Sequence, residues 1–280
     1  MNFKELEQYF ISELSFLYDE EETKQLFYLV VEQLSGWNRT HLLIHTTELL
    51  SAEQSVNYQD ILSKLKQGRP MQHIFAEAWF YGLKFKVSEA VLIPRPETEE
   101  LIEWILNTVK MHPVSRILDI GTGSGCIAIT LKKNLELVEV SALDVSADAL
   151  DIAKENAAIN SVTVNFIHAD ILSYSSTLKY ELIVSNPPYI TEHERDEMHQ
   201  NVLAYEPHLA LFVSNENPLL FYKSIADFAL LNLKPDGKLF FEINEYLGEE
   251  TVDMLSTKGF KNITLKSDMQ GKDRMISCNL

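Results

Sequence analysis

The sequence predicts an α/β fold in which a mostly parallel sheet carries helices on both faces, preceded by a small helical domain and a β-hairpin. From residue 115 onward, short apolar runs typical of buried strands alternate with helical patterns, as in chains that form parallel sheets. Residues 1–70 show apolar residues at helical spacing and no strand-like alternation. Between these parts, residues 74–93 are rich in aromatic and β-branched residues and predict the hairpin.

The helical part is delimited by its apolar spacing and by a Gly-Pro break. Apolar stripes at helical spacing run over residues 3–17, 21–34 and 58–65, with Thr47 or Ser51 as candidate helix caps. The break at 68–70 then interrupts the pattern. We therefore expect three parts, which are a helical domain over 1–72, a β-hairpin linker over 73–94 and an α/β domain over 95–280.

The α/β part is expected to begin with an extended segment, because each residue before a proline in Ile93-Pro94-Arg95-Pro96 is pushed out of the helical region. In an open parallel sheet, ligands bind at the carboxyl ends of the strands, where the strand order reverses. The predicted strands cover residues 116–120, 138–143, 162–167, 182–185, 237–243, 263–266 and 274–278. The predicted helices cover residues 97–109, 124–131, 147–158, 218–233 and 247–255.

Composition narrows the class of partner and the compartment. The chain of 280 residues has 24 basic and 41 acidic residues, a net charge of -17, whereas a duplex-binding protein normally presents a basic face. Its two cysteines form no C-x-x-C pair, which fits a reducing compartment. The sequence shows no signal peptide and no run long enough to span a membrane. We expect a cytoplasmic monomer with no membrane association and no direct nucleic acid partner.

A glycine-rich turn, Gly121-Thr122-Gly123-Ser124-Gly125, follows the first predicted strand and opens a helix. Glycines let the backbone turn sharply and approach a ligand closely, and the helix N-terminus adds free N–H groups. A dinucleotide site usually has its third glycine one residue later, and Asp119 ahead of the turn is awkward for a pyrophosphate. The segment favours the cationic ligand S-adenosylmethionine, with a dinucleotide or a plain turn as open alternatives.

Two acidic residues end the next predicted strands. Asp144 stands where a carboxylate can accept both hydroxyls of a ribose. It is alternatively a helix cap, but Ser146 is better placed for that role. Asp170 is a candidate acceptor for an adenine amino group, with Ile171 packing on the ring. A turn-forming aspartate is an equally open interpretation of Asp170.

The segment Asn186-Pro187-Pro188-Tyr189 directly follows an apolar strand. Two consecutive prolines give a rigid, extended turn. In such a turn the Pro187 carbonyl and the Asn186 side-chain oxygen can accept both N–H bonds of one planar –NH₂ group. Tyr189 is expected to offer a ring face to the substrate. The order of the preceding motifs disfavours the alternative of an ordinary proline-rich turn.

This arrangement suits the methylation of an amide or amine nitrogen. An amide nitrogen is a poor nucleophile because its lone pair is delocalised into the carbonyl. Two fixed acceptors hold it in line with a sulfonium methyl group and attract the positive charge that develops on it. Orientation alone can supply about 7–11 kcal/mol in favourable cases. The sequence therefore predicts a methyltransferase that uses S-adenosyl-L-methionine and releases S-adenosyl-L-homocysteine.

These motifs together resemble one enzyme family. The string Ile93-Pro94-Arg95-Pro96-Glu97-Thr98-Glu99, combined with Asn186-Pro187-Pro188-Tyr189, resembles the HemK/PrmC family of peptide chain release factor glutamine methyltransferases. The resemblance includes Tyr205-Glu206-Pro207, Phe241-Glu242-Ile243 and residues 268–274, and it covers nearly the whole chain. Family members commonly have glycine near the position of Ala76.

The resemblance implies a class I (Rossmann-like) methyltransferase sheet and methyl transfer to the side-chain N5 of the glutamine in the Gly-Gly-Gln motif of release factors. It implies that the helical domain recognises the release factor. The catalytic residues it implies are Asn186, Pro187, Pro188 and Tyr189. The cofactor-binding residues expected from the motifs and the resemblance are Asp119, Gly121, Thr122, Gly123, Ser124, Gly125, Asp144, Asp170, Ile171 and Asn186.

Other interpretations stay open at this point. A glutamine methyltransferase of a ribosomal protein and an N-methyltransferase of nucleic acid bases would share the Asn-Pro-Pro-Tyr motif, whereas a non-catalytic or NAD-dependent protein leaves that motif without a role. No metal is expected, because His41 and His45 stand four apart without a carboxylate companion. His193 and His199 flank a charged run that is expected to be a mobile segment after the site.

Overall fold

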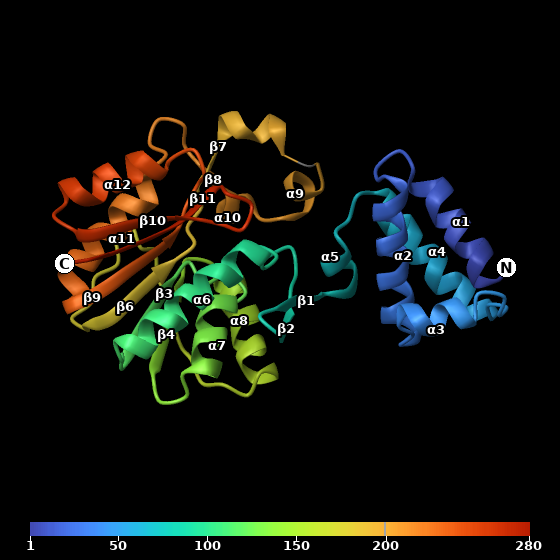
Figure 1. Cartoon of the computed structure of the whole chain (residues 1–280), viewed down its shortest axis with the longest axis horizontal. Helices are drawn as coiled ribbons and strands as arrows, with labels where there is room; N and C mark the ends of the chain where they lie inside the picture. The colour runs from blue at the N-terminus through green and yellow to red at the C-terminus, as the bar shows by residue number, and fades with distance from the viewer. Residues whose placement is uncertain (199) are drawn as a thin grey trace. The chain divides into compact units, whose positions relative to one another are not determined.

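The computed structural model describes residues 1–198 and 200–280. The chain forms two compact units (Figure 1). One contains Met1–Ala76 together with helix α9 (Gln200–Tyr205), and the other contains Glu77–Met198 and Glu206–Leu280. The first unit is helical and the second is built on a mixed seven-stranded sheet. The α/β fold class with a small N-terminal helical domain is therefore confirmed.

The helical unit forms because its first four helices each begin at a polar cap and bury apolar residues. Asn2 and Ser51 complete capping boxes at the starts of two helices, so Ser51 rather than Thr47 is the cap that the sequence left open. Phe3, Phe10 and Phe27 lie in its buried core. The helices of this part are α1 (Phe3–Leu14), α2 (Glu20–Ser35), α3 (Arg39–Ile44), α4 (Ala52–Lys66) and α5 (Met71–Phe75).

Helix α9 belongs to this unit although it lies more than 120 residues further along the chain. The Asn201 amide donates a hydrogen bond to the Tyr18 hydroxyl at 3.1 Å, and the Tyr205 hydroxyl donates to the Gln67 carbonyl at 3.0 Å. The sequence did not predict that α9 belongs to this unit, because hydrogen bonds between distant segments leave no periodic pattern in the sequence.

The predicted hairpin is present, but it begins later than expected. It consists of β1 (Glu77–Phe80) and β2 (Leu83–Lys86), which pair antiparallel around Tyr81 and Gly82. Residues 74–75 belong to helix α5 instead, and Ala76 ends that helix in the left-handed region at φ 52°. Short apolar runs do not distinguish strand from helix by periodicity alone, which explains the error.

The sheet has the strand order β10-β11-β9-β6-β3-β4-β5. The five strands from β9 to β5 in this order run parallel, and β11 pairs antiparallel with both of its neighbours. These strands are β3 (Arg116–Ile120), β4 (Glu139–Asp144), β5 (Asn165–His168), β6 (Tyr180–Ser185), β9 (Leu233–Glu242), β10 (Lys261–Ser267) and β11 (Asp273–Asn279). Each lies within a few residues of its predicted position.

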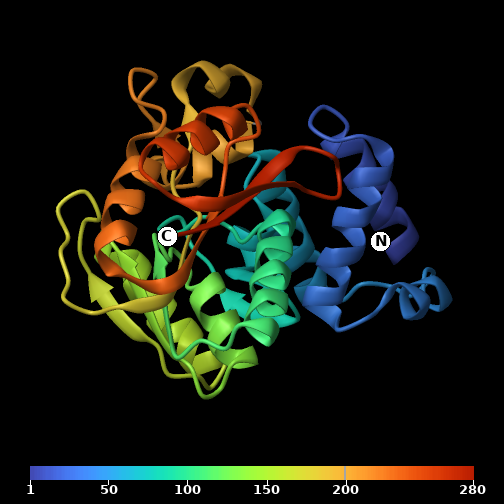
Figure 2. The ribbon, with the colours of Figure 1, turned by 60° about the vertical axis from the view of Figure 1, so that its left-hand side comes forward.

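Two apolar cores cover the two faces of this sheet (Figures 1 and 2). Successive strand residues point to opposite faces, so Leu182 and Ile183 lie in different cores. Residues of α6 and α7 fill one core, and residues of α11 and α12 fill the other. The helices of this unit are α6 (Pro96–Met111), α7 (Cys126–Asn134), α8 (Ala147–Ile159), α11 (Leu220–Asn232) and α12 (Gly248–Thr257).

The strand order reverses between β3 and β6. From β3 the chain proceeds through β4 to β5 on one side and then returns to place β6 on the other side of β3. The loops after β3 and β6 therefore leave neighbouring strand ends, which is where open α/β sheets bind ligands. The glycine-rich turn follows β3, and Asn186 follows β6.

Several short elements after β6 were not predicted. The parallel strands β7 (Ile190–Thr191) and β8 (Phe212–Val213) pair with each other, with the 3₁₀ helix η1 (Glu192–Glu197) and helix α10 (His208–Leu211) between them. The run expected to be a mobile segment is thus a capped helical turn in this structure. Among the described residues, no helix combines the length and apolar character that crossing a membrane requires.

Changing Ala76 to glycine should stabilise the protein. Ala76 is exposed and has φ 52°, a left-handed conformation that costs a residue with a Cβ roughly 1–2 kcal/mol. Allowing for the greater unfolded-state freedom of glycine, we expect Ala76→Gly to raise the free energy of unfolding by about 1 kcal/mol. The exposed helical residue Ala158 gives the control, since Ala158→Gly should lower it by a similar amount. Urea denaturation measures both, and equal losses would refute the backbone argument.

Candidate active site

A cavity of about 250 Å³ opens at the carboxyl ends of β3, β4 and β6. All of its lining residues belong to the α/β unit. The predicted site residues that line it are Gly121, Thr122, Gly123, Ser124, Asp144, Asp170, Ile171, Asn186, Pro187 and Pro188. Asp119, Gly125 and Tyr189 are not among its lining residues. The fold therefore brings most of the predicted residues together around one cavity.

The glycine-rich turn is held against the end of β4. The N–H groups of Gly121 and Thr122 both donate to the Leu143 carbonyl, at 2.8 and 3.0 Å. Gly123 has φ 55° and lines the cavity, so its backbone approaches the ligand space without strain. Gly125 serves packing instead, because an added Cβ would lie 2.8 Å from Ile129 Cδ1. An added Cβ would also lie 3.1 Å from the Cβ of Ala153, so glycine at this position lets the start of α7 pack closely against α8.

Asp119 lies behind the turn and not in the cavity. Its carboxylate is buried, accepts a hydrogen bond from the Thr122 hydroxyl at 2.6 Å and accepts one from the Ala128 N–H at 3.3 Å. Burial raises the pKa of Asp119 from 3.8 to about 7. The geometry gives no support to the expected direct contact with the cofactor. It supports a positioning role, in which Asp119 joins the turn to the first turn of α7.

Asp144 lies at the cavity, and Ser146 takes the helix-cap role that was the alternative for Asp144. Ser146 caps α8 by accepting from the Ala149 N–H at 3.1 Å, as predicted. Asp144 lines the cavity, and its two carboxylate oxygens accept from the Gly123 N–H at 2.8 Å and the Ser146 N–H at 2.9 Å. Each oxygen keeps further acceptor capacity, so the fixed carboxylate can still accept both hydroxyls of a ribose.

Asp170 and Ile171 line the cavity beyond the end of β5. Asp170 Oδ1 accepts from the Leu172 N–H at 2.9 Å, so this residue does form the turn that was the alternative interpretation. The second carboxylate oxygen of Asp170 takes no part in the hydrogen bond to Leu172. Leu172, Phe221 and Ile225 add apolar lining. An aromatic ring with one amino group matches this combination of an acidic edge and apolar walls.

The Asn186-Pro187-Pro188 segment forms the cavity wall that follows β6. Tyr189 turns away from it, since its hydroxyl donates to Glu242 Oε1 at 3.2 Å and its carbonyl accepts from the Asn244 amide at 3.0 Å. The Tyr189 ring packs against the apolar core that contains residues of α11 and α12. The predicted ring contact with substrate therefore has no support in this geometry, and Tyr189 anchors the end of the segment.

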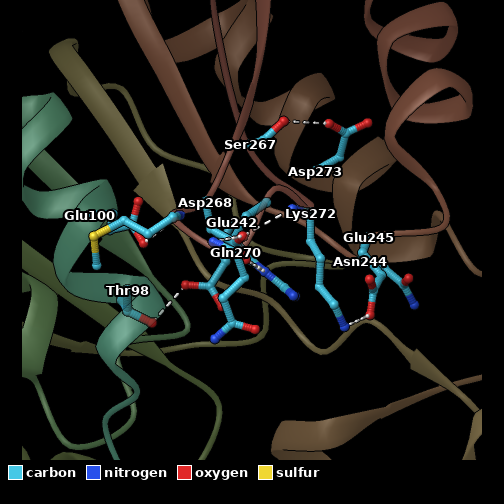
Figure 3. Close-up of polar contacts among 12 residues, drawn as sticks. Thr98, Glu100, Glu242, Asn244, Glu245, Ser267, Asp268, Gln270, Lys272 and Asp273 are labelled. Carbon is cyan, nitrogen blue, oxygen red and sulfur yellow. Dashed lines mark hydrogen bonds and ion pairs between the residues drawn. The ribbon is translucent and has the colours of Figure 1, made fainter.

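A buried polar network behind this segment was missed by the sequence analysis. Thr98 and Glu242 are both buried, and the Thr98 hydroxyl donates to Glu242 Oε2 at 2.6 Å (Figure 3). The Asn186 amide nitrogen lies 3.4 Å from the Thr98 hydroxyl oxygen, to which it donates. Burial raises the pKa of Glu242, and the positive charge of Arg274 opposes that rise. The available signal was a single acid, Glu242, directly after the apolar run Leu239-Phe240-Phe241.

Two further contacts fix the segments around the cavity. Arg95 forms an ion pair with the buried Glu206, whose other oxygen accepts from the Ile93 N–H at 3.0 Å. Arg95 also lines the cavity. In the turn between β10 and β11, the Asp268 carboxylate accepts hydrogen bonds from the Lys272 N–H at 3.0 Å and from Arg274 Nε at 3.2 Å (Figure 3). These bonds hold the turn in place.

Among the described residues, His41, His45 and His193 do not line the cavity. His41 and His45 stack their rings with centroids 4.5 Å apart in the helical unit, and His45 Nδ1 lies 3.0 Å from a Glu48 carboxylate oxygen. His193 lies in η1, and His199 is outside the described residues. Within 1–198 and 200–280, no group of three or more metal-type ligands comes together.

The pH dependence of stability should report the burial of Asp119. A folded-state pKa of about 7 means that the folded chain holds a proton that the unfolded chain releases above pH 3.8. The free energy of unfolding contributed by this group therefore falls as pH rises from about 4 to about 7. Relative to wild type, Asp119→Asn should gain up to about 4 kcal/mol across that range. Urea denaturation of the cofactor-free chain at several pH values measures this.

Asp151→Asn, a substitution on the exposed face of α8, is the matched control for Asp119→Asn. Its effect on the free energy of unfolding should stay small across the same pH range. A difference between Asp119→Asn and wild type that does not change with pH would contradict the assigned burial.

Comparison with known proteins agrees with this geometry. Residues 100–209 match the family described as "Methyltransferase small domain", and residues 5–75 match the "PrmC N-terminal domain". Among solved structures, the hMettl16 catalytic domain in complex with the MAT2A 3'UTR hairpin 6 superposes with a TM-score of 0.57. That match has 18% identity and covers 71% of this chain and 76% of that chain, so it supports the fold alone.

Two curated relatives match along nearly their whole length. The chain is 47% identical over 274 residues to the release factor glutamine methyltransferase of Flavobacterium psychrophilum, with 96% of each chain covered. It is 41% identical over 274 residues to that of Bacteroides thetaiotaomicron, covering 97% of this chain and 98% of the relative. The chain is an S-adenosyl-L-methionine-dependent methyltransferase, and it belongs to the release factor glutamine methyltransferase family.

Proposed function

We propose that this enzyme transfers a methyl group from S-adenosyl-L-methionine to the side-chain N5 of the glutamine in the Gly-Gly-Gln motif of peptide chain release factors. The observation that carries the proposal is the position of the Asn186-Pro187-Pro188 segment. It lines the same cavity as the glycine-rich turn, from the neighbouring strand end. A planar amide and a methyl donor are thereby held on adjacent walls of one space.

The cavity residues fit the cofactor. The glycine-rich turn and the start of α7 line the space for a polar tail, and Asp144 is fixed to accept ribose hydroxyls. Asp170 and the apolar residues beside it suit an adenine ring. Bound there, the cofactor would supply an activated methyl group on a sulfonium. Gly121 and Gly123, both with positive φ, add no side chain to the turn.

The chain's own contribution to the chemistry is orientation and polarity. The Asn186 oxygen and the Pro187 carbonyl are the two acceptors proposed for the glutamine –NH₂ group, and Pro187 lies outside strands β6 and β7. Accepting both N–H bonds fixes the plane of the amide and draws positive charge, which builds on nitrogen during transfer. No strong general base is required, because the methylated nitrogen becomes acidic and sheds its proton afterwards.

We propose that the helical unit recognises the release factor. The sequence predicts divisions at residues 72 and 94, and the compact helical unit of the structure spans Met1–Ala76 together with α9. The net charge of -17 suits a partner that is basic or bound to RNA. The expectations of a monomer, a cytoplasmic location and no direct nucleic acid partner remain predictions, as do the individual roles of the site residues.

A labelling experiment tests the substrate. The protein is given methyl-labelled S-adenosyl-L-methionine with a release factor, ribosomal proteins or DNA in parallel reactions. Label should enter the release factor, and a release factor whose Gly-Gly-Gln glutamine is changed to alanine should take up none. Label on ribosomal protein or DNA, with the release factor unlabelled, would instead select one of the two alternative substrates.

Two substitutions should separate substrate orientation from cofactor binding. Asn186→Ala removes one of the two proposed acceptors, so methyl transfer should fall by roughly a hundredfold or more while the Kd for S-adenosylhomocysteine stays within about twofold. Asp144→Ala removes the ribose acceptor and should raise that Kd by roughly tenfold or more. Radiolabel transfer and isothermal titration calorimetry measure the two effects.

The matched controls are Asn107→Ala and Asp151→Ala, which truncate exposed residues of α6 and α8 and should change neither quantity. Full activity of Asn186→Ala would refute its assigned role. An unchanged cofactor affinity of Asp144→Ala would reduce Asp144 to a support of the turn.

A further inference from the structure

The side-chain amide of Asn186 has two ends of nearly identical shape and opposite polarity. Only the oxygen end can accept a hydrogen bond from a substrate –NH₂ group, because the nitrogen end is a donor. If the proposed function is correct, an amide turned the wrong way would present two donors to each other. Something in the site must therefore set the orientation of this amide before the substrate arrives.

The hydrogen bonds around Thr98 can set this orientation. Glu242, when ionised, can only accept hydrogen bonds, and its two oxygens accept from the Thr98 hydroxyl at 2.6 Å and from the Tyr189 hydroxyl at 3.2 Å. A threonine hydroxyl has one proton. Because Thr98 donates that proton to Glu242, its oxygen is left as an acceptor, and the group 3.4 Å away is the amide nitrogen of Asn186. The direction of the hydrogen bond from Thr98 to Glu242 therefore determines the direction of the hydrogen bond between Thr98 and Asn186.

The fold places these residues in register. Strand β6 pairs parallel with β9, and Ser185 is the partner of Phe241, so Asn186 and Glu242 follow at adjacent positions at the strand ends. Thr98 lies in the first turn of α6, which packs over this part of the sheet. Thr98 and Glu242 are both buried, so water does not compete for their hydrogen bonds.

The carboxylate is also stabilised from the other side. Burial raises the pKa of Glu242, and the Thr98 hydroxyl, the positive charge of Arg274 and the Tyr189 hydroxyl act against that rise. Glu97 is the neighbouring charge that acts against ionisation. Through its two oxygens, one carboxylate thus contacts Tyr189 directly and Asn186 through Thr98, at the two ends of the Asn-Pro-Pro-Tyr segment.

We propose that Thr98 and Glu242 are positioning residues that orient the Asn186 amide with its nitrogen toward Thr98 and its oxygen toward the reacting nitrogen. This inference rests on the proposed function for its chemical consequence, but the amide orientation itself exists without substrate. Thr98 lines the cavity beside Asn186, whereas Glu242 is not among the lining residues, and the role proposed for both is exerted through Asn186. Their contribution is to present an acceptor that is already turned the right way, which removes a reorganisation step from methyl transfer.

The kinetic test replaces Thr98 with valine, which keeps the shape and removes the hydroxyl, and with serine, which keeps the hydroxyl. Thr98→Val should lower kcat by roughly tenfold or more, and Thr98→Ser should stay within about threefold of wild type. The Kd for S-adenosylhomocysteine should be unchanged in both. The control is Thr108→Val in the same helix, whose hydroxyl donates to the Trp104 carbonyl. Equal activity of the valine and serine variants would overturn the proposal.

A double-mutant cycle distinguishes the relay from two independent structural effects. Glu242→Gln reintroduces a donor where the relay requires an acceptor, so it should lower kcat on its own. If both residues act only through Asn186, Thr98→Val with Glu242→Gln should lower kcat little more than the worse single substitution does. Additive losses, or a parallel loss of cofactor affinity, would show general damage and overturn the inference.

A spectroscopic measurement tests the orientation without any substrate. In ¹⁵N-labelled protein, the side-chain amide signals of Asn186 are identified as the pair missing from Asn186→Ala. These signals should shift in Thr98→Val and Glu242→Gln but not in Thr98→Ser or Thr108→Val. Insensitivity to Thr98→Val would overturn the inference whatever the substrate is. Failure of wild type to label any glutamine would overturn the proposed function alone.

Discussion

The parallel pairing of β3 with β6 is the constraint on which the site depends. Ile120 is the register partner of Ser185, and the Ser185 hydroxyl donates to the Ile120 carbonyl at 2.6 Å. The next residue on each strand is therefore Gly121 on one side and Asn186 on the other. The cofactor turn and the substrate segment begin side by side because the strand order reverses between these two strands.

Buried acids hold the loops that leave this edge. Asp119 supports the glycine-rich turn, Glu206 clasps the segment before α6, and Glu242 contacts both ends of the Asn-Pro-Pro-Tyr segment through hydroxyl groups. Burying a carboxylate is costly unless it is paired or hydrogen-bonded. Each of these acids has such partners. These partners offset the cost of burial and fix the positions of the loops around the cavity.

Most of the fold was predictable because helices and strands in the α/β unit carry strong periodic patterns. The prediction was wrong at residues 74–75, where a short apolar run belongs to α5 and not to the hairpin. It had no means of finding α9 in the helical unit, since its bonds to Tyr18 and Gln67 join distant segments. Ala76 takes a left-handed conformation, which glycine adopts more readily than residues with a Cβ.

The sequence alone determined the chemistry. The order of the glycine-rich turn, Asp144 and Asn186-Pro187-Pro188-Tyr189 indicated a donor of methyl groups and a planar nitrogen, because motif residues act through properties of their own side chains and backbone. Only the tertiary structure decided which of them face the cavity. It placed Asp119 and Tyr189 behind it and brought Thr98 and Glu242 up to Asn186. Those contacts join strands and helices more than 80 residues apart, and such distances leave no local pattern to read.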